Sequence, residues 1–273
     1  MLALGPWQIA AVEDGRFALD GGAMFGVVPR TLWQQQIAPD DQNRIEMALR
    51  CLLVHGQGRT VLVDTGMGDA WTEKQRAIYS IRRERTLVDA LRDLGVERGD
   101  VTDVVLTHLH FDHAGGAVQP TGELTFPRAA HWVQRRSWEH AQRPSTRDRG
   151  SFRADLIAAL RPSLLDGAHE LMPGFDLLVS EGHTPGLQLA RIHGGGATLY
   201  YCADLVPTAA HLKLAWGMAY DLQPLVVIEE KKALLDRALR EDATLVFEHD
   251  PRLAACTLRS EKGETAVARE VRL

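Results

Sequence analysis

Four metal-binding side chains stand within six residues, directly after an apolar segment that is expected to form a strand. The segment is Val101 to Leu106, and the side chains that follow it are His108, His110, Asp112 and His113. In an extended chain the first three project to one side, whereas the last histidine requires a turn, which the following glycine pair allows. A bent segment with four donors serves two neighbouring ions more readily than one tetrahedral shell. The segment therefore predicts part of a two-metal hydrolytic site.

The composition is typical of an ordinary soluble globular chain. With 273 residues and 45% hydrophobic content, a single domain over residues 1–273 is the simplest prediction. A net charge of -5 and a pI near 6.1 favour a small-molecule substrate over nucleic acid. The sequence shows neither a charged leader nor an apolar stretch long enough for a bilayer, so we expect a cytoplasmic protein without a membrane partner. A homodimer is one candidate assembly.

The cysteines are few, odd in number and widely spaced. They are Cys51, Cys202 and Cys256, and no CxxC pair occurs. We therefore expect reduced core residues rather than a thiolate metal site.

Periodicity predicts strands in the first third of the chain, at 16–20, 47–54 and 60–63. A helix is expected over Thr86 to Leu94, with Gly95 as its C-terminal cap. Two arginine-rich helical stretches interrupted by Pro144 follow a strand at 131–134. Further strands are predicted at 176–180, 187–192, 198–202 and 244–247, with a helix over Glu229 to Arg240 before the last of them.

Three more donors follow predicted buried strands, as His108 does. They are His183, Asp204 and His249. Because functional groups gather beyond the strand ends of open α/β sheets, the four segments are expected to share one edge. Seven donors exceed one tetrahedral shell but suit two ions if one carboxylate is shared. A turn or capping role explains a lone His or Asp well, but it explains this repeated placement poorly.

The ordered set of motifs resembles the metallo-β-lactamase superfamily. The matching pieces are the HxHxDH motif at 108–113, Gly182-His183-Thr184-Pro185-Gly186, Asp204, His249 and the upstream Leu62-Val63-Asp64-Thr65-Gly66. The resemblance implies an α+β fold, a four-layer αββα sandwich with metals at one edge between the sheets. It implies that His108, His110 and His183 hold the first ion. Asp112, His113 and His249 would hold the second, with Asp204 as the bridge.

The resemblance also implies a reaction. Two Zn²⁺ ions per chain, with Fe, Mn or Co as alternatives, would supply a metal-bound hydroxide that cleaves an ester, lactone or related bond in a small, partly hydrophobic substrate. Asp112 would be catalytic, shuttling a proton to the leaving group. Asp64 would orient a ligand imidazole from behind, although a turn residue is an equal interpretation.

Within the superfamily, the segment from Gly21 to Arg30 is similar to the region before the core in N-acyl-homoserine lactonase-like and organophosphate-hydrolase-like members. Candidate substrate-binding residues are Met24, Phe25, Trp33, His211, Trp216, Met218 and Tyr220, although aromatic and Met residues are more often part of a core. Lactonases of this group carry a tyrosine where this chain has Pro207. Either Tyr220 or His211 is a candidate replacement for that phenol.

Other activities of the same scaffold remain open at this point. A mononuclear iron, persulfide dioxygenase-like oxidoreductase is the main alternative, because iron accepts the same donors. Phosphotriesterase or thioesterase activity is another, although the tail after Asp250 is too short for the helical domain of glyoxalase II-like thioesterases. A nuclease is disfavoured, since the arginines over 135–153 are typical of a solvated helix face.

Overall fold

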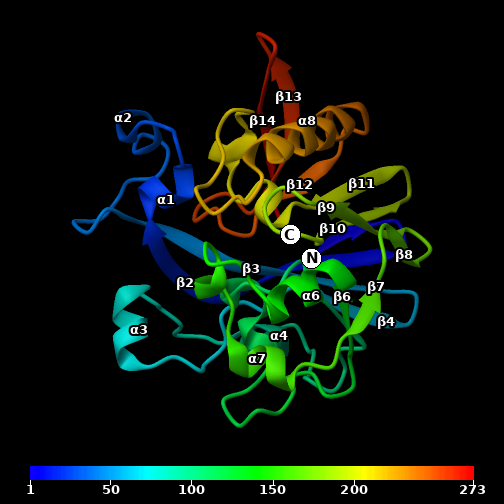
Figure 1. Ribbon diagram of the computed structural model, residues 1–273. Helices are drawn as coiled ribbons and strands as arrows, with labels where there is room; N and C mark the ends of the chain where they lie inside the picture. Colours follow the sequence, from blue (N-terminus) through cyan, green and yellow to red (C-terminus); the bar gives the residue numbers. More distant parts are fainter.

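The computed structural model describes residues 1–273 as two seven-stranded mixed sheets packed face to face, with helices on both outer faces (Figure 1). The first sheet has the order β1 (Leu2–Leu4), β2 (Trp7–Asp20), β3 (Arg44–Gly56), β4 (Arg59–Val63), β5 (Asp103–Val105), β6 (Ala130–Gln134) and β7 (Ser163–Leu165). It is antiparallel from β1 to β4 and parallel from β4 to β7.

The second sheet is mainly antiparallel. Its order is β14 (Glu264–Val271), β13 (Ala255–Glu261), β12 (Thr244–Val246), β11 (Ala197–Tyr201), β10 (Leu187–Gly194), β9 (Phe175–Ser180) and β8 (His169–Met172). Only β11 and β12 pair in parallel. The helices are α1 (Gly21–Phe25), α2 (Arg30–Trp33), α3 (Glu73–Ile78), α4 (Leu87–Asp93), α5 (Phe111–Ala114), α6 (Arg135–Gln142), α7 (Ala154–Ala159) and α8 (Pro224–Arg240). None of them combines the length and apolarity that a bilayer crossing requires.

Alternate side chains along a strand point to opposite faces of the sheet, so each sheet contributes apolar residues to two layers of the core. In β4, Val61 and Val63 face the second sheet, whereas Leu62 faces the outer cluster that includes α4 and α7. On the other side, Leu234 and Leu235 of α8 pack against the second sheet in the same cluster as Val61. The layers therefore run helix, sheet, sheet, helix, which confirms the predicted α+β, αββα sandwich.

Local sequence patterns predicted several helices and strands correctly but placed some of their ends wrongly. The helix expected at Thr86 begins with a capping box between Thr86 and Asp89, and Gly95 after it has a left-handed φ of 77°. Helix α8 begins at Pro224 rather than Glu229, because proline at the first turn suits a helix start. Strand β2 begins at Trp7, nine residues before the predicted start at Arg16. The residues after 250 add β13 and β14 to the second sheet.

All three cysteines are buried and free, as expected. Cys51 lies on β3, Cys202 directly follows β11, and Cys256 lies on β13. They contribute to the core.

Candidate metal centre

The HxHxDH segment turns through a short helix. Strand β5 ends at Val105, and His110 is the N-cap residue of α5, whose single turn carries Asp112 and His113. The predicted turn at His113 therefore exists, but the glycines serve a different purpose. A Cβ on Gly116 would lie 2.1 Å from the Thr65 carbonyl oxygen, so this glycine permits the close approach of the loop after β4.

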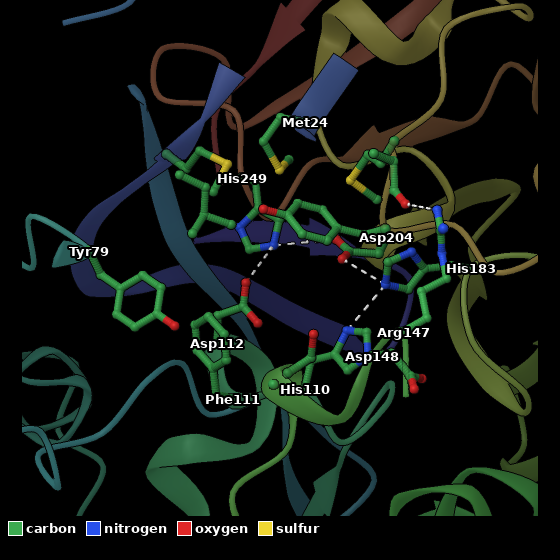
Figure 2. Close-up of a pocket in the computed structure, with 17 residues that line it drawn as sticks. Met24, Tyr79, His110, Phe111, Asp112, Arg147, Asp148, His183, Asp204 and His249 are labelled. Carbon is green, nitrogen blue, oxygen red and sulfur yellow. Dashed lines mark hydrogen bonds and ion pairs between the residues drawn. The ribbon is translucent and has the colours of Figure 1, made fainter. Parts of the chain in front are cut away.

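The three remaining donors lie at the same edge, in segments that follow strands of the second sheet. His183 follows β9, Asp204 lies in the 3-10 turn Ala203–Leu205 after β11, and His249 follows β12. Figure 2 shows Asp112, His110, His183, Asp204 and His249 converging on one cavity. The strand ends thus assemble the seven predicted donors from segments up to 141 residues apart.

The donors form two buried groups with the geometry of metal sites. In each group the candidate ligand atoms lie within 4.8 Å of one another, and the groups are His108, His110, His183 and Asp204, and Asp112, His113 and His249. Asp204 lies between them, with Oδ2 3.2 Å from His183 Nε2 and Oδ1 3.3 Å from His249 Nε2. This is the position of a carboxylate that can contact two ions.

Hydrogen bonds behind the rings fix which nitrogen faces the centre. His183 Nδ1 lies 2.9 Å from Asp221 Oδ1, and His249 Nδ1 lies 2.9 Å from the Ala48 carbonyl oxygen. Because these acceptors require an N–H, Nε2 of each ring presents a lone pair inward. His113 Nδ1 likewise faces a carboxylate, that of Asp64, so its Nε2 points towards the centre. There it lies 3.2 Å from His249 Nε2.

Two lone pairs at this distance need a cation between them. Burial acts to lower the pKa of His249, but the Asp204 carboxylate raises it to about 9, so a proton can take this place in the metal-free chain. Asp204 Oδ1 adds a buried oxygen without a hydrogen-bond donor. The donor set of imidazoles and carboxylates suits Zn²⁺ and other divalent transition metals. The residues present therefore fit divalent metal ions.

Burial and neighbouring charges shift the pKa values of the donors in different directions. Burial lowers the pKa of His108 and His110 well below the usual value, and the neighbouring imidazoles add to this effect. Burial acts to raise the pKa of Asp204, but the surrounding imidazoles, His113 foremost, hold it well below its usual value. Burial acts to lower the pKa of His113, His183 and His249 as well, but the carboxylates around these three rings raise it, to about 9 for His249. Metal binding would therefore displace protons from them.

The structure places the Asp64 carboxylate behind the metal-binding segment. Its carboxylate accepts the Thr107 N–H and the Thr107 hydroxyl, each at 2.7 Å, and so fixes the start of the metal-binding segment. The same carboxylate lies 3.1 Å from His113 Nδ1. Its backbone has a left-handed φ of 60°.

A cavity of about 500 Å³ opens over the donors. Its apolar lining consists mainly of Leu19, Met24, Met47, Phe111 and Met218, and its polar lining includes Tyr79, Arg147, Asp148 and Tyr220. Figure 2 shows Tyr79 across the cavity from His183, with its hydroxyl directed towards Asp112. Of the seven predicted substrate-binding residues, Met24, Met218 and Tyr220 line this cavity.

Phe25, Trp33, His211 and Trp216 belong to the packing behind the cavity wall, which corrects the prediction that they contact substrate. Phe25 stacks on Trp33 at 5.5 Å and on His211 at 4.9 Å, and its ring meets Trp216 edge-on. Both nitrogens of His211 are used, by the Thr208 hydroxyl at 2.8 Å and the Met24 carbonyl at 2.9 Å. His211 therefore has no nitrogen free to replace the phenol expected at Pro207.

Replacing His211 with glutamine is expected to flatten the acid-induced loss of stability. Burial lowers the pKa of His211 from 6.5 to about 4, so the unfolded chain takes up the proton first as the pH falls. The wild-type protein should lose about 3 kcal/mol of unfolding free energy across this window, and the variant should lack that contribution. Urea unfolding of both metal-free proteins at several pH values measures the slopes, and equal slopes would contradict a buried neutral His211.

The sequence analysis did not predict several residues of the site. Asp221 orients His183, and Glu248 lies 2.8 Å from His113 Nδ1. Neither stands in a motif of its own, although Glu248 directly precedes His249. Tyr79, Arg147 and Asp148 reach the cavity from exposed or irregular segments with no local sequence signal.

Comparisons with known proteins agree with this geometry. The family model described as Metallo-beta-lactamase superfamily matches residues 49–249. An N-acyl homoserine lactonase from Bacillus sp is 28% identical over 154 residues, which are 53% of this chain and 58% of that relative. The match therefore spans little more than half of the curated relative.

Two solved structures match over nearly their whole length. A probable metal-dependent hydrolase from Staphylococcus aureus has a TM-score of 0.91 and 27% identity, covering 99% of this chain and 100% of that chain. AidC, a dizinc quorum-quenching lactonase in complex with a product, has a TM-score of 0.83 and 23% identity, covering 100% and 97%.

The fold and the site together define a metal-binding protein of the αββα class. The match over residues 49–249 then places it within that class: the chain belongs to the metallo-beta-lactamase superfamily.

Proposed function

We propose that this protein is a metal-dependent hydrolase that cleaves a lactone or related ester carrying an apolar arm, with two divalent ions, zinc foremost, as cofactors. The observation that carries the proposal is the pair of buried donor groups joined by Asp204 at the floor of a half-apolar cavity. Similarity to named lactonases supports the same reaction class.

The seven donors would bind the ions, and one of them, Asp112, would also transfer a proton. His108, His110 and His183 would hold one ion, Asp112, His113 and His249 the other, and Asp204 both. Bound ions would lower the pKa of water and polarise the scissile carbonyl. The Asp112 carboxylate borders the cavity, where it can accept a proton from the nucleophile and return it to the leaving oxygen.

The cavity wall supports a substrate with a flexible apolar arm. Met24, Met47 and Met218 are unbranched and polarisable side chains, which adapt to ligands of varied shape. Leu19 and Phe111 extend this surface, so that an acyl chain can leave water while the reacting carbonyl lies at the donors. On the opposite rim, the buried Asp148 accepts hydrogen bonds from Ser145 and His140.

Replacing Tyr220 with phenylalanine is expected to lower kcat about 10²-fold, with little change in KM. Burial and the nearby negative charge of Asp112 raise the pKa of Tyr220 to about 12, so the phenol keeps its proton and can donate to a developing oxyanion. Steady-state kinetics on the preferred lactone measure the effect. Tyr79 lines the same cavity and is the matched control. A larger loss in Tyr79→Phe than in Tyr220→Phe would contradict the choice of Tyr220.

A substrate panel combined with elemental analysis tests the proposal. Purified protein is assayed on N-acyl lactones of increasing chain length, aryl esters, thioesters and phosphotriesters, and its metal content is measured in the same preparation. We expect two zinc ions per chain and the highest kcat/KM on lactones or esters with medium acyl chains. One iron per chain without zinc would reject the dizinc hydrolase in favour of an iron oxidoreductase, and metal-replete protein inactive on the whole panel would reject hydrolysis.

A further inference from the structure

We propose that Lys231 of α8 is a positioning residue, whose buried ammonium group holds the loop over residues 213–223 in the place that the reaction requires. This loop connects the 3-10 turn Ala209–Leu212 to the start of α8 at Pro224. The inference rests on the hydrolase proposed above and adds to it the residue that fixes one wall of its cavity.

The loop carries groups of both the cavity and the metal centre. Met218 and Tyr220 line the cavity. The Asp221 carboxylate lies 2.9 Å from His183 Nδ1 and accepts the Met218 N–H at 2.8 Å. A shift of the loop would therefore move the apolar wall and the acceptor behind His183 together.

Lys231 holds the first half of this loop. Its ammonium group donates to the Lys213 carbonyl at 3.2 Å and also to the Trp216 carbonyl. No other hydrogen bond joins residues 213–217 to the rest of the chain. The attachment to α8 therefore decides where the loop enters the cavity wall.

The second half of the loop is held by its backbone instead. The Ala219 N–H donates to the Ala23 carbonyl at 2.8 Å, and the Gln223 N–H donates to the Gly182 carbonyl at 2.8 Å. Loss of the lysine should therefore loosen the loop without detaching it, so that a folded protein with a displaced wall is the expected result.

Packing alone does not account for a lysine at this place. Lys231 is only 1% exposed, and its two acceptors are neutral carbonyls rather than a carboxylate. An apolar side chain would fill the same space without the cost of burying a charge. The Lys213 carbonyl already accepts the Trp216 N–H at 3.0 Å, so it has a donor without the lysine. What the ammonium group adds is the attachment of the loop to α8.

The groups around the ammonium make this attachment dependent on pH. Burial lowers the pKa of Lys231 to about 8, although the buried Asp221 acts to raise it. His211 is the other titratable group that faces the lysine, and burial keeps its pKa at about 4 and its ring neutral. As the pH rises through the pKa of Lys231, the ammonium becomes an amine, which donates to carbonyls more weakly. The loop should loosen over the same range.

Hydrogen exchange of the metal-free protein tests the attachment, with Lys232→Met as the matched control for Lys231→Met. Lys232 is the next residue of α8, is exposed and pairs with Asp236. In Lys231→Met we expect the N–H groups of residues 216–223 to exchange about tenfold faster or more, because hydrogen bonds from a charged group are lost. Exchange in α4 should keep its wild-type rate in both variants. Lys231→Gln, which retains a neutral donor, should fall between wild type and Lys231→Met.

Kinetics of the metal-replete protein separate positioning from mere support of the fold. On a medium-chain aryl ester at about pH 7, we expect Lys231→Met to have a kcat/KM about tenfold below that of the wild type. At about pH 9.5 the difference should shrink to about twofold, because the wild-type lysine has then lost its proton too. Lys232→Met should match the wild type at both pH values.

The outcomes distinguish this inference from the proposed function. Wild-type exchange rates in the loop of either folded Lys231 variant would overturn the positioning role while leaving hydrolysis intact. Equally faster exchange in the loop and in α4, or a kinetic difference that is the same at both pH values, would also overturn it, since either result marks general support of the fold. A wild-type protein that hydrolyses no ester or lactone would instead refute the proposed function, and loop exchange in the metal-free variants would still decide whether Lys231 holds the loop.

Discussion

Replacing Asp112 with asparagine is expected to lower kcat by about 10²- to 10⁴-fold, the range that general acid–base catalysis contributes. The carboxylate lies 3.7 Å from the His249 ring and 4.0 Å from the His113 ring, too far for hydrogen bonds within the metal-free chain. We therefore expect the free energy of unfolding of the metal-free protein to change by about 1 kcal/mol or less. Single-turnover kinetics at saturating metal and urea unfolding measure the two effects.

A second carboxylate in the same cavity provides the matched control for Asp112. Asp148 accepts hydrogen bonds from His140 and Ser145, each at 2.6 Å, so Asp148→Asn should lower stability more than Asp112→Asn does. The Asp148 variant should also retain most of its turnover at saturating substrate. Wild-type turnover in metal-saturated Asp112→Asn would refute the proton-transfer role, whereas low turnover with incomplete metal content would point to ligation alone.

Removing the metal is expected to abolish hydrolysis and to destabilise the protein. His113 Nε2 and His249 Nε2 lie 3.2 Å apart, and Asp204 Oδ1 lies 3.3 Å from His249 Nε2, so a bound divalent ion would link segments that are distant in the sequence and stabilise their folded arrangement. At a metal concentration about 1,000 times Kd, binding stabilises the native state by about 4 kcal/mol. For a chain of this size, this corresponds to a fall in Tm on the order of 10 °C on chelation.

Thermal unfolding and activity, measured before and after chelation and after adding back Zn²⁺, Co²⁺ or Mn²⁺, test this expectation together. Both properties should return with the metal. His193 is half-exposed and lies outside both donor groups, so His193→Gln should respond to chelation like the wild-type protein. Full activity in protein that elemental analysis shows to be free of metal would contradict the proposed mechanism.

Much of the fold followed from local sequence patterns. The helix after Thr86 was predicted because its capping residues and its apolar spacing are local properties. The strands that precede the donors were recognised as apolar runs, and their common placement predicted a shared edge. Boundaries were less accurate where pairing with a neighbour extends a strand, as in the first half of β2.

The cavity wall shows where such patterns stop being informative. Phe25 and Met24 are adjacent in the sequence and equally apolar, yet Met24 borders the cavity whereas Phe25 stacks between Trp33 and His211. Hydrophobic character is the same in a core and in a binding wall. Only the packing of α1 against its neighbours decides which side chain faces the substrate.

The sequence by itself determined the identity and order of the seven metal-binding side chains, because their types and spacing are chemical properties of the chain. Tertiary structure alone decided which nitrogen of each ring faces the centre. The acceptors that set this orientation come from distant segments: Asp221 lies 38 residues from His183, and Asp64 lies 49 residues from His113. A hydrogen bond between such partners leaves no periodicity in the sequence, since its geometry exists only once the chain has folded.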